Sequence, residues 1–294
     1  MKYLLPVLAC ALLVSCTSTH KKKEKNDLER LHYNGKVKSV AYKIYRAKGD
    51  SGTKGEKEMV VSKVITMCNN NGYFVGQDNF KNGERLNYRV MRKYDTNNNL
   101  VTETRMETVV VNLSQGDMKG DSMKMEKDTF AYKFDNNGNK IEMKVSRNKK
   151  PSYRDVNTFD ANGNITYQEE YVPWDTLYKK ESYKYDKDGN VIEKISRHPD
   201  TSKYVSYSYK YDAKGNMIEC FSKESKSDRS STETIKYDDK GNIIEDVNKD
   251  NTGYVFWNWR YEFSEFDKNG NWTKETSYSN NKPQAITERQ IDYY

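Results

Sequence analysis

The stretch SYKYDKDGNVIEKISR, Ser182–Arg197, decides the fold, because a near copy of it, SYKYDAKGNMIECFSK, follows at Ser208–Lys223. Tyrosine, aspartate, glycine and asparagine return at the same offsets in both copies, and a fixed period indicates a repeat architecture. With a degenerate copy around Asn69, the chain holds about eight units at a period of about 26 residues. The motif aspartates are Asp95, Asp135, Asp160, Asp186, Asp212, Asp238 and Asp267.

Each unit predicts a β-hairpin. Residues before the turn alternate between two faces, as Tyr207, Tyr209 and Tyr211 do, which is the period of a β-strand. Aspartate at the first turn position accepts hydrogen bonds from turn amides, and glycine at the fourth adopts the left-handed conformation. The residues expected to build these structural turns are Asp135, Gly138, Asp160, Gly163, Asp186, Gly189, Asp212, Gly215, Asp238, Gly241, Asp267 and Gly270.

The predicted fold is all-β. It is an antiparallel meander of about eight hairpin repeats that forms a large twisted or curled sheet, with a half-barrel as its most curled form. A membrane-spanning barrel is disfavoured, because both faces of Val191–Arg197 mix charged and apolar side chains, and neither suits lipid. Gly35–Tyr45 is the expected N-terminal edge, and its interspersed lysines would protect it from pairing with another chain.

These Tyr/Phe-Asp-x-x-Gly-Asn units resemble the YD repeats of Rhs-type bacterial surface and toxin proteins, over roughly residues 60–275. The resemblance implies antiparallel hairpins in a curved sheet or shell. The period is longer than is usual in those families, and a toxin-like C-terminal domain is missing from the pattern. The chain is therefore most similar to small YD-repeat lipoproteins of Bacteroides-like bacteria, whose function is generally unassigned.

The first residues indicate export. An apolar stretch of about a dozen residues follows Lys2, too short to span a bilayer, and Leu13–Cys16 resembles the lipobox of bacterial lipoproteins. We expect a signal peptide at residues 1–15, a lipidated charged tether at 16–34 starting with Cys16, and a β-hairpin repeat domain at 35–294. By resemblance to lipoprotein sorting rules, the outer membrane is the expected address, with the periplasmic side favoured over the cell surface.

Composition favours no nucleic-acid partner, because a net charge of +7 over 294 residues is mild and lysine alternates with acidic residues. Of the four cysteines, Cys68 and Cys220 remain after processing, and we expect free thiols. The Asp-x-x-Gly-Asn turns lack the ligand spacing of a calcium loop, so neither a metal nor another cofactor is expected.

The chain also shows no catalytic constellation. Its three histidines are isolated, and Glu193, Glu219 and Glu245, which recur at one offset, are interpreted as a solvated face paired with lysines. We expect a protein that is not an enzyme, with a glycoside-active enzyme as a weak alternative.

Aromatic residues supply the candidate binding surface. Trp257, Trp259 and Tyr261 fall on one face of a strand, and Trp174 lies in an atypical loop. They can form local core or a platform for an envelope protein or glycan. The first hypothesis is a monomeric, membrane-anchored lipoprotein presenting this Tyr/Trp-rich surface, and the alternative is an envelope scaffold without a small ligand. Exposure of the two tryptophans would favour binding, and their burial would favour the scaffold.

Overall fold

The computed structural model describes residues 25–48, 57–82, 85–112, 119–199 and 202–294. The expected signal peptide and the lipidation site Cys16 lie outside the described residues. Within them the chain forms one four-residue helix and 18 antiparallel strands, so the all-β prediction is confirmed.

The elements are α1 (Asp27–Arg30), β1 (Val37–Ala47), β2 (Lys57–Cys68), β3 (Phe74–Lys81), β4 (Arg85–Tyr94), β5 (Leu100–Asn112), β6 (Lys119–Phe134), β7 (Lys140–Arg147), β8 (Lys150–Phe159), β9 (Ile165–Tyr171), β10 (Leu177–Tyr185), β11 (Val191–Arg197), β12 (Tyr204–Tyr211), β13 (Met217–Glu224), β14 (Ser230–Tyr237), β15 (Ile243–Asp250), β16 (Val255–Phe266), β17 (Trp272–Ser279) and β18 (Lys282–Tyr293).

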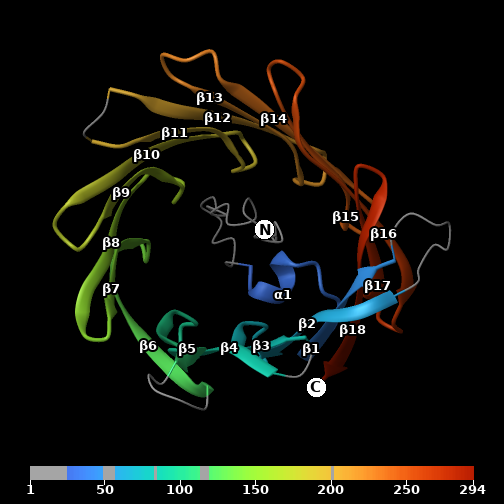
Figure 1. Ribbon diagram of the computed structural model, residues 1–294. Coiled ribbons are helices and arrows are strands. Elements are labelled where there is room, and N and C mark those ends of the chain that lie inside the picture. The colour runs from blue at the N-terminus through green and yellow to red at the C-terminus, as the bar shows by residue number, and fades with distance from the viewer. Residues whose placement is uncertain (1–24, 49–56, 83–84, 113–118, 200–201) are drawn as a thin grey trace.

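The sheet is closed, so the prediction of an open twisted sheet or half-barrel is wrong. Each strand pairs with its neighbours in sequence, and β1 also pairs with β18 from Val37 opposite Tyr293 to Arg46 opposite Ala285. The result is the ring seen in Figure 1. The expected N-terminal edge is wrong for the same reason, because β1 is hydrogen-bonded to β2 on one side and β18 on the other. Closure satisfies the backbone groups that an edge would expose.

The inward face is identified by α1, which lies inside the ring (Figure 1). Leu28 of α1 packs on Val37, Val40 and Cys68 in a small buried cluster, so those side chains point inward. Directly opposite residues on paired strands share a face, and the registers extend this assignment around the barrel. Burying Leu28 contributes about 2 kcal/mol, which holds α1 against the wall.

The outward face carries charges. Lys184, Lys210 and Lys236 contact the carboxylates of Glu193, Glu219 and Glu245 at 2.9, 2.8 and 2.7 Å, each across one hairpin. The interpretation of these glutamates as a solvated, lysine-paired face is confirmed. A lipid-facing wall needs an apolar band, and these rows of exposed ion pairs do not supply one.

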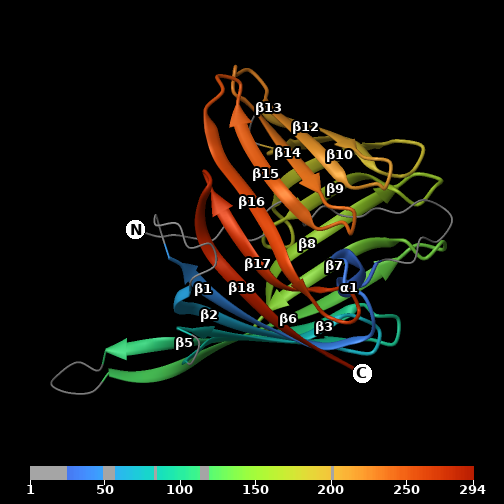
Figure 2. The same ribbon diagram turned by 90° about the vertical axis from the view of Figure 1, so that its right-hand side faces the viewer.

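The two ends of the barrel differ. One end, here called the turn end, carries the Asp-x-x-Gly-Asn turns, and the other, the loop end, carries the variable connections. Figure 2 shows both ends from the side, with β5 and β6 extending beyond the rest. In the turn after β10, Asp186 Oδ1 accepts from Asp188 N and Asn190 N, and Gly189 has φ 80°. The same two backbone N–H contacts are made by Asp135, Asp160, Asp212, Asp238 and Asp267.

A tyrosine contact ties several hairpins to the hairpin before them. The residue before the turn aspartate donates its hydroxyl to the first carbonyl of the preceding return strand, as Tyr211 does to Val191 at 2.8 Å. Tyr94, Tyr185 and Tyr237 repeat this contact. In the units of Asp135 and Asp160, where phenylalanine precedes the aspartate, the residue two positions earlier makes the contact: Tyr132 donates to Leu100, and Asn157 donates to Lys140. The motif tyrosine is therefore an inter-repeat contact.

Candidate functional site: the inward wall of the barrel

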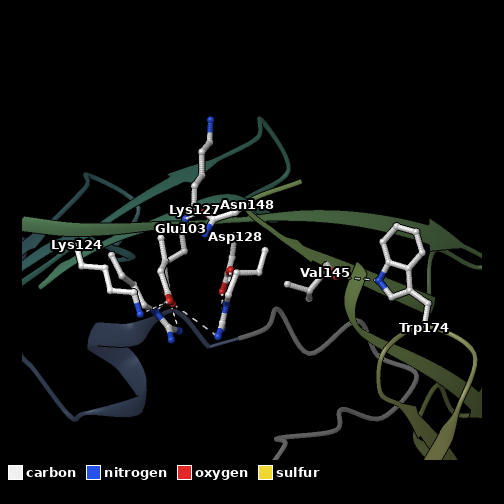
Figure 3. A network of polar contacts seen from close by, with 10 residues as sticks. Glu103, Lys124, Lys127, Asp128, Val145, Asn148 and Trp174 are labelled. Carbon is white, nitrogen blue, oxygen red and sulfur yellow. Dashed lines mark hydrogen bonds and ion pairs between the residues drawn. The ribbon is translucent and has the colours of Figure 1, made fainter. Parts of the chain in front are cut away.

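Ion pairs line the inward face of β4–β7. Glu103 accepts from Arg92 at 2.7 Å and from Arg105 at 2.6 Å, and its side chain is only 6% exposed. Arg147 donates to Asp128 from the neighbouring strand at 2.9 Å. Figure 3 shows Glu103 and Asp128 on the side of the sheet that faces α1, with Lys127 pointing away. Burial alone would raise the pKa of Glu103, but the two guanidinium groups outweigh it and lower that pKa.

A different inward wall stands on β12–β16. We call it the aromatic wall and define it as Tyr207, Trp257, Trp259 and Tyr261 with the carboxyl groups of Glu233 and Asp246. Cross-strand registers place its members in adjacent rows, because Glu233 lies opposite Asn248, which lies opposite Trp257, and Asp246 lies opposite Trp259. The four aromatic side chains are half-buried. Barrels with this number of strands are too wide for side chains to fill, so the wall faces space.

The carboxyl groups of the aromatic wall are held in fixed positions. Asp246 Oδ1 accepts from the indole Nε1 of Trp257 at 2.9 Å, and Asp246 also shares a hydrogen bond with Glu233, which is buried. Two carboxyl groups can share a hydrogen bond only if one of them carries a proton. Burial raises the pKa of Asp246, in agreement with such a protonated pair.

Polar groups continue the aromatic wall toward the loop end. Ser222 and Ser231 are hydrogen-bonded to each other at 2.8 Å, and Lys194 Nζ lies 4.6 Å from the centre of the Tyr207 ring. The arrangement combines flat apolar rings with hydroxyl, amide and carboxyl groups. Such a surface can stack on the apolar faces of sugar rings and hydrogen-bond their hydroxyls.

The structure separates Trp174 from the other candidate residues. Trp174 lies in the β9–β10 connection and donates to the carbonyl of Val145 at 2.8 Å (Figure 3). The Lys144 ammonium lies over its ring, 5.2 Å from the ring centre. Trp257, Trp259 and Tyr261 come together on β16. Both tryptophans of β16 are half-buried, so neither the exposure that would favour binding nor the burial that would favour a scaffold is met in full. A register shift between Phe263 and Glu265 marks a β-bulge in the same strand.

The cysteines, possible metal ligands and possible membrane-spanning helices were also predicted or weighed from the sequence. Cys68 and Cys220 are free thiols. Among the described residues, no group of three or more histidine, cysteine or acidic side chains is arranged to hold a metal ion. In the same part of the chain, no helix has the length and apolar character required to cross a bilayer.

Two open depressions lie away from the aromatic wall. One, of about 490 Å³, is lined by Ser62, Asn79 and Tyr88 among others, and the second, of about 610 Å³, by Tyr204 and the polar β13–β14 connection. Neither lining includes a tryptophan, so the aromatic wall remains the candidate site.

Sequence reasoning missed the carboxyl half of the site. Glu233 and Asp246 stand outside the repeated motif and look like ordinary strand residues, because alternation shows that a residue faces one side without showing which side is enclosed. The available signal was their departure from the Lys–Glu pairing of their neighbours: both lie on the opposite strand face from Lys236 and Glu245.

The search of family models found no match to this chain, and neither did the search of curated proteins. Among solved structures, a porin-like protein from Bacteroides uniformis shares 9% sequence identity at a TM-score of 0.44, over 88% of this chain and 98% of that one. A crystal structure of TcdB2-TccC3-TEV shares 11% identity at a TM-score of 0.30, over 83% of this chain and 16% of the other. A Tc holotoxin pore of Photorhabdus luminescens shares 12% sequence identity at a TM-score of 0.30, over 79% of this chain and 15% of the other. The chain thus spans less than a fifth of these toxin chains.

Proposed function

We propose that this protein is a non-enzymatic, lipid-anchored β-barrel of the cell envelope that binds a glycan on its aromatic wall. The observation that carries the proposal is the inward, half-buried position of Trp257 and Trp259 beside the Asp246 carboxyl. Aromatic rings give a sugar a large apolar contact, and the buried polar groups around them give orientation. The envelope address and the anchor at Cys16 rest on the lipobox resemblance.

The proposal includes the absence of glycoside hydrolysis. A retaining glycosidase needs two carboxyl groups about 5 Å apart and an inverting one needs them farther apart, each with its own role. Glu233 and Asp246 share a hydrogen bond, which brings their oxygens closer together than either geometry. Such a pair suits hydrogen bonding to a ligand better than a divided acid and nucleophile.

The test is titration calorimetry of the full chain in a mild detergent against neutral N-acetylglucosamine oligomers and other envelope glycans. We expect binding that Trp259→Ala weakens at least about tenfold, since tenfold corresponds to about 1.4 kcal/mol, within the range of a lost aromatic contact. The matched control is Trp174→Phe, a tryptophan away from the wall. Circular dichroism checks that each variant is folded. No binding to any glycan, or equal losses in both variants, would refute the proposal.

A further inference from the structure

The turn end of the barrel is occupied directly beneath the aromatic wall. The segment Asn26–Asn34 runs from the β2–β3 turn, where Asn26 lies against Gly72, to the turns of β14–β17. His32 lies against Gly241, where an added Cβ would come within 3.4 Å of His32 Nδ1. A ligand on the aromatic wall therefore meets protein at the turn end of β14–β17, whereas no such segment lies against the loop end of β16 among the described residues.

The segment is fastened there by side chains. Asn34 N donates to Asn271 Oδ1 at 2.8 Å, and Asn271 Nδ2 donates back to Asn34 O at 2.9 Å. Asn271 belongs to the β16–β17 turn, and it is fully packed at 3% exposure. The occupation of this end is thus part of the folded wall.

The loop end above the same wall presents two uncovered aromatic rings. Tyr254 and Phe256 are 65% and 54% exposed, and their rings meet edge to face with centroids 5.5 Å apart. They stand where β16 begins, directly before Trp257. Their turn is fixed, because Asp250 Oδ1 accepts from Thr252 N and Tyr254 N, both at 2.9 Å. The pair is therefore held at the lip of the barrel.

We propose that the ligand is a polymeric glycan that enters and leaves only at the loop end, where Tyr254 and Phe256 form a second subsite for the part of the chain outside the barrel. This inference rests on the proposed function. Along a strand, Tyr254 and Trp259 are separated by about 17 Å, which is longer than a single sugar ring. Large apolar rings left uncovered on a surface mark a contact site, and these two precede Trp257 in the chain, at the loop end of β16.

The experiment compares the dimer and the hexamer of N-acetylglucosamine by titration calorimetry on the full chain in detergent. The wild type is expected to bind the hexamer at least about tenfold more tightly than the dimer. The double variant Tyr254→Ala/Phe256→Ala is expected to lose this preference and to keep its affinity for the dimer. Tyr178→Ala is the matched control, since Tyr178 is 51% exposed at the same end but on β10, and it should change neither affinity.

The outcomes separate the two proposals. If the wild type binds neither oligomer, the proposed function and this inference both fail. If it binds both equally, or if the double variant keeps the preference for the hexamer, the lip subsite is refuted while glycan binding on the aromatic wall stands. Both substituted residues are exposed, so folding is retained, and circular dichroism verifies this.

Discussion

Tyr211 donates its phenolic hydroxyl to the carbonyl oxygen of Val191 at 2.8 Å and so joins one hairpin to the hairpin before it. The carbonyl lies at the first residue of β11, next to the turn, where the ladder of the sheet has just been interrupted by a register shift. One side-chain hydroxyl thus satisfies a backbone acceptor at the same place in several units.

Removing this hydroxyl should destabilise the barrel. Tyr211→Phe leaves the Val191 carbonyl without its donor, and we expect the free energy of unfolding to fall by about 1 kcal/mol. Urea denaturation followed by circular dichroism measures it. The control is Tyr254→Phe at the exposed lip, which should change stability by less than about 0.5 kcal/mol. Equal effects would contradict the role assigned to the motif tyrosine.

The turn glycines should matter through backbone conformation alone. Gly138 has φ 81°, and an added Cβ there would meet nothing within 4 Å. Gly138→Ala is therefore expected to cost about 1–2 kcal/mol from the left-handed conformation, measured by thermal unfolding. Asn98 holds the corresponding position at φ 64° in the unit of Asp95, and Asn98→Gly should be close to neutral. A neutral Gly138→Ala would mean that the turn relaxes into another form.

The inward ion pairs should contribute more to the free energy of unfolding than the outward ones. Glu103→Gln leaves Arg92 and Arg105 beside a neutral amide, and we expect a loss of about 2 kcal/mol. Glu193→Gln removes the partner of the exposed Lys184 and should cost under about 0.5 kcal/mol. Denaturant unfolding of both variants makes the comparison, and similar losses would show that the lumen screens its charges as bulk solvent does.

Glu275 should give stability a specific dependence on pH. Burial raises the pKa of Glu275 to about 7, although the positive charge of Arg289 acts to lower it. Because the folded state then binds a proton that the unfolded state releases near pH 4.3, this group favours folding at low pH, and its contribution is lost as the pH rises toward 7. The unfolding free energy of Glu275→Gln relative to wild type should therefore increase by about 3 kcal/mol between pH 4.5 and 7.5. A flat difference would exclude the raised pKa.

The barrel should remain a monomer. The described strands offer no unpaired edge, since β1 and β18 pair with each other, so strand addition has no template. Light scattering of the full chain in detergent, corrected for bound detergent, is expected to give the mass of one chain. A stable dimer would contradict this prediction.

Hairpins and turns could be predicted because their determinants are local. Asp186, Gly189 and Asn190 act within five residues of one another, and alternation is visible in Tyr207–Tyr211. Closure could not be predicted, because it depends on twist summed over 18 strands and on a pairing between residues as distant as Val37 and Tyr293.

Which face of each strand points into the barrel could not be predicted from the sequence either. Both faces of most strands carry charged side chains, and only the position of Leu28 on Val37, Val40 and Cys68 distinguishes them. Tryptophan clustering identified half of the aromatic wall, whereas Glu233 and Asp246 became visible only when their strands were placed beside β16.

Because β1 pairs with β18, no repeat of this barrel stands at a free end. A linear array of repeats has two end members with one neighbour each, and they fray first unless special caps protect them. In a ring every strand has two neighbours, so no strand can detach by breaking a single interface. A strand can leave only if both of its pairings break. The barrel is therefore expected to unfold as one cooperative unit, so a substitution in any hairpin should lower the stability of the whole ring.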